Sequence, residues 1–201
     1  MAPWVTYEDD FDVLVVGAGH AGTEAAVAAA RRGARTGLIT SALETIGQMS
    51  CNPAIGGVAK GTVVREVDAL GGIMARATDL ASLQFRMLNR SKGPAVWAPR
   101  AQCDRGLYRR AVRTLLEAHP SLRTIQGTVA RLVFDGQAVA GVETLEGRRF
   151  SARSVVITTG TFLRGRIHIG TTTSLAGGRA GLDANGKEIE IVTSNFRLFT
   201  P

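Results

Sequence analysis

Apolar and polar residues follow three successive patterns over the first forty positions. The run from Phe11 to Val16 is almost continuously apolar, which is typical of a buried strand. Residues 20–32 are rich in alanine, and Gly33 follows them at the position that favours a helix C-cap. A second apolar run covers residues 35–40. The pattern predicts a strand, a helix and a second strand in close succession.

The rest of the chain does not continue this alternation evenly. A helix is expected over residues 58–70, then a long insertion with only short helical patches over residues 71–102, and then a helix over residues 104–118. After these we expect a strand, a hairpin pair turning near Asp135 and Gly136, and a further hairpin strand. The last expected element is a buried strand from Ser154 to Thr158. An antiparallel hairpin before a last parallel strand is typical of two-dinucleotide-binding flavoproteins. The predicted fold class is therefore α/β, a Rossmann-like FAD-binding domain with an inserted antiparallel β-hairpin region.

Three glycines lie between the first predicted strand and its helix, in the spacing G-x-G-x-x-G. Gly17 would make the tight turn, Gly19 would let a pyrophosphate approach the backbone, and Gly22 would let helix and strand pack closely. The helix N-terminus would then offer amide donors and a partial positive charge to the phosphates. We therefore predict a dinucleotide site at residues 17–22, which include Ala18, His20 and Ala21.

The acidic residue that commonly holds the ribose hydroxyls is missing after the second strand. Thr40 and Ser41 stand there, and the nearest acid is Glu44. A hydroxyl or the backbone could hold the ribose instead, so this position does not identify the cofactor. The last predicted strand would pass beside the glycine turn and would place Thr159 and Gly160 near the cofactor.

Composition narrows the class of protein only modestly. The chain has 201 residues, 45% of them hydrophobic and 20% charged, which is ordinary for a globular protein. Its net charge of +7 suits a phosphate-bearing or nucleic-acid partner. Two cysteines make no disulfide framework, no apolar run reaches the length of a membrane span, and no His, Cys or carboxylate cluster has metal-ligand spacing. We expect a cytoplasmic protein that is not membrane-bound.

A cysteine in a turn is the main candidate for chemistry. Cys51 lies in the stretch GQMSCNPAIGG, where proline and glycine argue against a strand or helix. Such a thiol could act as a nucleophile or in proton transfer, or it could be an inert turn residue. Cys103 begins a helical pattern and is interpreted as a packing residue.

Basic residues gather in and around the long insertion. Lys60, Lys92 and Arg100 are the candidate RNA contacts, with Trp97 among them. This mixture of charge and aromatic surface is what loop or single-stranded RNA uses, although a solvated basic face has the same composition.

Five longer stretches carry a resemblance to a known family: GAGHAGTEAA, GQMSCNPAIGG, KGTVVREVDALGG, FRMLNRSKGPAVWAPRAQCDR and GTFLRGRIHIG. They resemble the glucose-inhibited division protein A family, also called MnmG. The resemblance implies an FAD enzyme that uses NADH and methylene-tetrahydrofolate, acts with an MnmE-type GTPase, and adds a (carboxymethyl)aminomethyl group to C5 of the wobble uridine of tRNA. It further implies FAD pyrophosphate at Gly17 to Gly22, an adenine-side contact near Val129, a functional thiol at Cys51, and a homodimer in the complete protein.

The resemblance does not extend evenly along the chain. We expect an N-terminal tail over residues 1–10, the FAD-binding domain over residues 11–181, and a divergent tail over residues 182–201, so the domain is incomplete relative to the family. The alternatives are a related flavoprotein, such as a folate-dependent tRNA methyltransferase or an oxidoreductase, and an FAD- or RNA-binding fragment without activity.

Overall fold

Four parallel strands form the centre of the molecule. The computed structural model describes residues 9–49, 52–160, 165–169 and 172–176. The parallel strands are β1 (Asp9–Val16), β2 (Thr36–Thr40), β6 (Leu122–Gln126) and β9 (Arg149–Ile157), in the order β6-β2-β1-β9. In chain order the parallel strands are third, second, first and fourth, which matches the first four positions of the Rossmann strand order 3-2-1-4-5-6. The predicted α/β fold class is confirmed.

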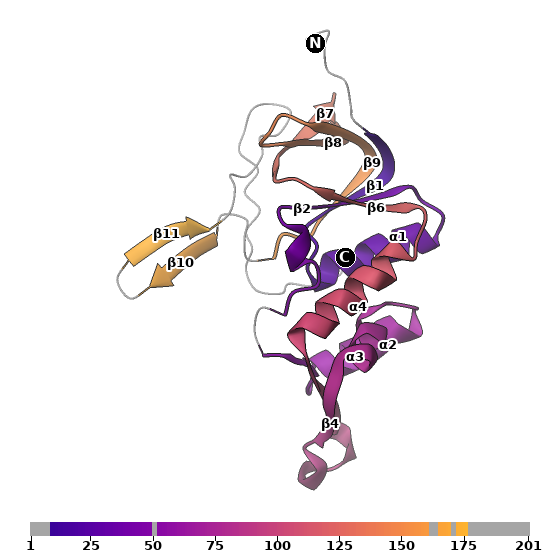
Figure 1. Cartoon of the computed structure of the whole chain (residues 1–201), viewed down its shortest axis with the longest axis vertical. Coiled ribbons are helices and arrows are strands. Elements are labelled where there is room, and N and C mark those ends of the chain that lie inside the picture. Colours follow the sequence, from indigo (N-terminus) through magenta and orange to yellow (C-terminus); the bar gives the residue numbers. More distant parts are fainter. Residues whose placement is uncertain (1–8, 50–51, 161–164, 170–171, 177–201) are drawn as a thin grey trace.

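Two helices cover one face of this sheet. Helix α1 (His20–Arg31) follows β1 directly, and α4 (Arg105–Glu117) lies beside it (Figure 1). Side chains such as Val15 and Leu38, which are both fully buried, pack against these helices. The predicted strand, helix and second strand are therefore present, with bounds shifted by one or two residues.

An antiparallel extension of the same sheet, beyond β9, covers the opposite face. Strands β7 (Val129–Asp135) and β8 (Ala138–Thr144) form the predicted hairpin, whose turn includes Gly136 at φ +61°. Leu132 of β7 and Val142 of β8 pack with Leu14 and Phe150 in a second core on the side away from α1 and α4 (Figure 1). The last two predicted strands are one continuous strand, β9, which pairs with both β8 and β1. The expectation that its end is buried was wrong, because Val156 and Ile157 are 36% and 37% exposed.

The region between β2 and α4, which includes the predicted helix at 58–70 and the long insertion at 71–102, forms a second, smaller unit. Its elements are η1 (Leu43–Thr45), β3 (Ala54–Gly56), α2 (Lys60–Ala69), α3 (Met74–Ala81), β4 (Ser82–Leu88), η2 (Arg90–Lys92), η3 (Pro94–Val96) and β5 (Ala98–Cys103). Strands β3, β5 and β4 form an antiparallel sheet in that order. The expectation of only helical patches was wrong here. We call residues 82–103 the β4–β5 arm, which projects from the helices in Figure 1.

Helix α1 ties this unit to the central sheet. The Glu24 carboxylate accepts hydrogen bonds from the backbone N–H groups of Ile73 and Met74, at 3.0 and 2.6 Å. Arg31 donates to the carbonyl of Leu70, at 3.1 Å. The negative carboxylate thus lies at the partially positive N-terminus of α3, and the positive guanidinium lies at the partially negative C-terminus of α2. Both charges are therefore attracted by the dipole of the helix end that they contact.

A further hairpin, β10 (Gly165–Ile169) and β11 (Thr172–Ala176), stands apart from the rest in Figure 1. Within the described ranges, no helix is both long and apolar enough to cross a bilayer.

Candidate dinucleotide-binding site

Two glycines of the turn are required by close backbone contacts. Gly17 has φ +99°, and a Cβ added there would lie 2.5 Å from the carbonyl oxygen of Thr158. A Cβ added at Gly22 would lie 1.7 Å from the carbonyl oxygen of Gly17. Real side chains do not tolerate such distances, so any larger residue would force the turn, α1 and β9 apart. Both positions have the structural role that the spacing predicts.

Gly19 differs from the other two glycines. It is exposed, and no heavy atom lies within 4 Å of a Cβ added there. It is also the N-cap residue of α1, at φ −75°, and its cap position makes no side-chain hydrogen bond. The protein therefore leaves open the space in front of the first amides of the helix. Amides and dipole at such an end attract an anion.

The topology places this open space at the point where strand order reverses. β1 and β9 are the neighbours from which the chain winds in opposite directions, and both end beside the glycine turn. In open α/β sheets, ligands bind outside the carboxyl ends of the strands at this reversal. The site therefore follows from two independent features, the glycine turn and the strand order.

Thr158 is a site residue that the sequence analysis missed. Its hydroxyl lies 2.9 Å from each of the carbonyl oxygens of Val16 and Gly17, and its backbone N–H donates to Val16 at 2.8 Å. These contacts hold the end of β9 against the glycine turn. The predicted residues Thr159 and Gly160 follow at the same edge of the sheet. The only signal in the sequence is the threonine pair that closes the last apolar run.

The predicted ribose and adenine positions lie at the neighbouring strand ends. Thr40 is buried at the end of β2, and its carbonyl accepts a hydrogen bond from the Gly127 N–H at 2.9 Å. Val129 begins β7 two residues later and is half-buried. Ala18 is buried and Ala21 exposed within the turn. The structure therefore gathers the predicted positions on β1, β2, β7 and β9 along one side of the sheet.

His20 lies at the junction between the glycine turn and the second unit. Its ring contacts the edge of the Tyr108 ring, with centroids 5.7 Å apart. Burial, with a smaller effect from the positive charge of Lys60, lowers the pKa of His20 from 6.5 to about 4. Its Nδ1 and the Tyr108 hydroxyl are buried and lack a partner among the described residues. The imidazole beside the predicted phosphate site is therefore neutral at pH 7.

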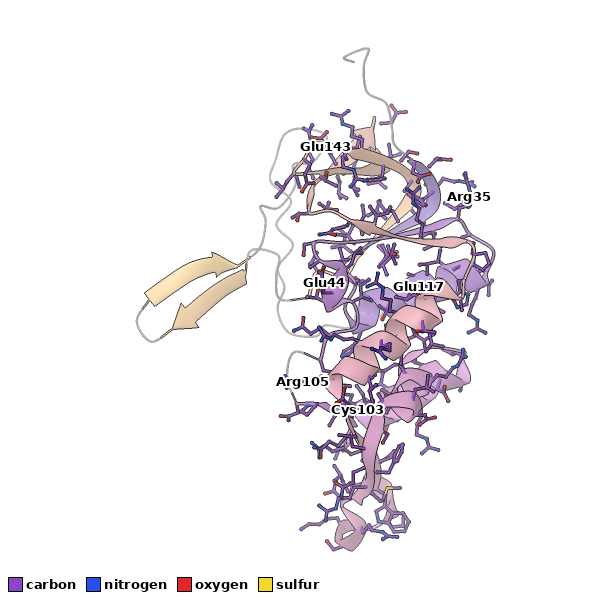
Figure 2. All side chains as sticks on the ribbon, viewed as in Figure 1. Arg35, Glu44, Cys103, Arg105, Glu117 and Glu143 are labelled. Atoms are coloured by element: carbon purple, nitrogen blue, oxygen red, sulfur yellow. The ribbon has the colours of Figure 1, made fainter. Side chains whose placement is uncertain are left out.

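The two cysteines differ in what the structure says of them. Cys51 lies outside the described residues, so its predicted role stays a prediction. Cys103 is 2% exposed, and burial raises the pKa of its thiol. Its backbone N–H donates to the carbonyl of Pro53 at 2.7 Å, at the base of the β4–β5 arm (Figure 2). The interpretation of Cys103 as a packing residue is confirmed.

The three predicted RNA contacts lie on different elements. Lys92 is exposed in η2 at the tip of the β4–β5 arm, Arg100 lies midway along β5, and Lys60 begins α2 near His20. Across the described part of the chain, no group of three or more His, Cys, Asp or Glu residues could hold a metal ion.

The sheet order and the glycine turn together define a protein of the Rossmann-like dinucleotide-binding class. The family model described as "Glucose inhibited division protein A" matches residues 12–199, and the chain belongs to this family.

Solved structures agree with this assignment. The match to GidA from Aquifex aeolicus in its form I crystal has 50% sequence identity and a TM-score of 0.79. It covers 84% of this chain and 28% of the Aquifex GidA chain. The match to the form II structure has 47% sequence identity and also a TM-score of 0.79, and it covers 92% of this chain and 30% of the Aquifex GidA chain. The chain thus spans less than a third of the length of these relatives. The match to the GidA-related protein from Thermus thermophilus has 23% sequence identity and a TM-score of 0.55, and it covers 89% of this chain and 64% of the Thermus chain. At this identity the similarity shows the fold alone.

Proposed function

We propose that this chain is the FAD-binding portion of an enzyme that adds a (carboxymethyl)aminomethyl group to C5 of the wobble uridine of tRNA. The observation that carries the cofactor-binding part of the proposal is the open space at Gly19, which lies in the sequence between two glycines that admit no side chain. Family membership supports the choice of FAD over other dinucleotides. The free space around the position of a Cβ at Gly19 fits a ligand that approaches the backbone closely.

The residues of the site fit the parts of FAD. The amides at the start of α1, around Gly19 and His20, would hold the pyrophosphate. The end of β2 at Thr40 would face the ribose, and Val129 would lie toward the adenine. Thr159 and Gly160, at the end of β9, would lie toward the flavin half. When bound, FAD supplies electron and hydride transfer; the chain's own residues supply position and shelter from water.

The neutral state of His20 bears on this binding. A neutral imidazole adds no charge to the phosphate site, so attraction for the pyrophosphate would come from the helix amides, its dipole and Lys60. Burial of the ring against Tyr108 also fixes the first residue of α1 in place. His20 is therefore a positioning residue in this proposal, not an acid or a base.

Cys51 is the proposed reactive group. In the nucleophilic role its thiolate would bond to C6 of the uracil and make C5 nucleophilic. C5 would then bond to the incoming one-carbon group, and loss of the C5 proton would break the bond between C6 and sulfur and release the thiolate. In the second role the thiol would only transfer a proton. NADH, methylene-tetrahydrofolate, an MnmE-type GTPase and a homodimeric assembly belong to the proposal through the family resemblance alone.

The absorption spectrum of the purified chain tests the cofactor. We expect visible flavin bands, or their appearance when FAD is added, and FAD rather than FMN after heat release and chromatography. A colourless protein that does not bind added FAD would remove the cofactor from the proposal. The uridine chemistry is tested separately, by nucleoside mass spectrometry of tRNA from cells that carry the complete protein with Cys51→Ser. Unchanged modification there would remove the thiol from the mechanism.

A further inference from the structure

A crevice of about 240 Å³ lies where helix α1 meets the second unit. Three parts of the chain line it: the C-terminal half of α1, the end of α2 with the start of α3, and the residue that follows α4. The lining includes Val27, Arg31, Asp68, Ile73, Arg76 and His119. Arg31 comes 11 positions after His20, so at a rise of about 1.5 Å per residue the crevice is about 17 Å from the glycine turn. It is therefore separate from the dinucleotide site.

Basic side chains reach this crevice from three elements. Arg31 comes from α1, Arg76 from α3, and His119 from just beyond the end of α4. Arg31 is fixed by its hydrogen bond to the carbonyl of Leu70, at 3.1 Å. The guanidinium of Arg76 and the imidazole of His119 have no hydrogen-bond or ion-pair partner among the residues that the structure describes. The crevice can therefore offer N–H donors to a ligand from three directions.

One acidic side chain lies on the same rim. Asp68 of α2 is exposed, and across the described part of the chain its carboxylate pairs with neither a guanidinium nor an N–H group. The floor is apolar, because Val27 and Ile73 are both fully buried. Two arginines and one aspartate give the lining a formal charge of +1 when His119 is neutral. The crevice therefore combines charges of both signs over an apolar floor.

The size and the charges of the crevice select the class of ligand. Its volume is below the range of about 300–1,000 Å³ that drug-sized ligands occupy, so the ligand is a small molecule. A phosphate ester has three terminal oxygens and can accept hydrogen bonds from three donor groups at once, whereas a carboxylate has only two oxygens. A plain anion would be repelled by Asp68, and a positive group on the same ligand would turn that repulsion into attraction.

We infer that this crevice binds a small phosphate monoester that carries an amino group. The phosphate lies among Arg31, Arg76 and His119, and the ammonium group faces Asp68. Such a ligand joins α1 and the end of α4 to α2 and α3, so it holds the second unit against the central sheet. The inference does not depend on the proposed function, because the crevice shares no residue with the glycine turn.

Isothermal titration calorimetry of the full chain, with excess FAD present, compares two probes. Phosphoethanolamine has a phosphate and an ammonium group, and ethyl phosphate has the phosphate alone. Phosphoethanolamine should bind about tenfold more tightly, because only it can pair with Asp68.

Three variants separate the contacts. Arg76→Gln, on the exposed side of α3, should weaken both probes about tenfold, since it removes a charged donor. Asp68→Asn should abolish the preference for phosphoethanolamine without weakening ethyl phosphate. The matched control is Arg110→Gln, on the exposed side of α4 and outside the crevice, which should stay within about twofold of the unaltered chain for both probes. Phosphoethanolamine should also raise the melting temperature of the unaltered chain more than that of Arg76→Gln.

Several results would overturn the inference. They are no saturable binding of phosphoethanolamine, equal binding by Arg76→Gln and the unaltered chain, and an Arg110→Gln effect as large as that of Arg76→Gln. A preference for phosphoethanolamine that survives in Asp68→Asn would refute the ammonium contact. Loss of phosphoethanolamine binding in Gly19→Val would move the ligand to the glycine turn. Flavin content, measured in the same samples, separates these failures from failure of the FAD proposal.

Discussion

The substitution Gly19→Val should weaken dinucleotide binding by about two orders of magnitude while leaving the fold nearly intact. No heavy atom lies within 4 Å of a Cβ at this position, and its φ of −75° suits any residue. The structural cost is the loss of a good N-cap residue, about 1 kcal/mol of unfolding free energy. The functional cost is larger. If the side chain blocks two charge-assisted amide contacts of about 1.5 kcal/mol each, affinity for FAD falls roughly 100-fold.

The matched control is Gly22→Ala, a smaller change with the opposite expectation. Its Cβ would lie 1.7 Å from the Gly17 carbonyl oxygen, so backbone must move. Overpacking of this kind costs about 3 kcal/mol. For a chain of this size the melting temperature should fall roughly 6–12 °C, against 2–4 °C for Gly19→Val.

Thermal unfolding followed by circular dichroism, and FAD titration followed by flavin fluorescence, measure the two effects separately. The reasoning predicts that Gly19→Val loses the ligand and Gly22→Ala loses stability. A Gly19→Val protein that binds FAD normally would show that no phosphate approaches this turn. A Gly19→Val protein that unfolds as readily as Gly22→Ala would refute the claim that the space at Gly19 is free.

Three further outcomes follow from named contacts. Thr158→Val should lower unfolding free energy by about 1–3 kcal/mol, because it keeps the shape but leaves the Gly17 carbonyl without its hydroxyl partner; urea unfolding measures this, and Thr158→Ser should recover most of it. The depressed pKa of His20, about 4, favours the neutral form in the folded state, so the stability it contributes is complete above about pH 6.5 and is lost as pH falls toward 4; His20→Phe should flatten that part of the pH–stability profile. Cys103 should resist alkylation at pH 8 until the protein unfolds, and rapid labelling of two thiols in the folded chain would contradict its burial, since only Cys51 is then expected to react.

The sequence was most informative where local pattern and tertiary role agree. β1, α1 and β2 were predicted closely because a buried run, an alanine-rich helix and required glycines all point to one unit. The hairpin turning at Gly136 was equally visible, since glycine in a left-handed conformation marks the turn. In both cases the deciding interactions lie within about thirty residues of each other.

Contacts between distant segments were not visible in the same way. Residues 82–87 of β4 alternate between polar and apolar, which is a strand pattern that the sequence analysis missed within the long insertion, whereas Pro99 in β5 argues against a strand. Glu24 reads as a solvent-facing helix residue until Ile73 and Met74 are seen to donate to it. Thr158 belongs to the site only because β9 ends beside Gly17, a contact across 141 positions of the chain.

The central position of β1 also has a consequence for synthesis of the chain. β1 can pair with β2 once residue 40 has been made, but its other neighbour, β9, ends only at residue 157. At about 5–20 residues per second on the ribosome, the interval lasts roughly 6–24 s. During that time one edge of β1, with its apolar run from Val13 to Val16, stays unpaired, and such edges promote aggregation. Early binding of a chaperone to this strand would therefore raise the yield of folded protein, and slower translation between residues 40 and 157 would lower it.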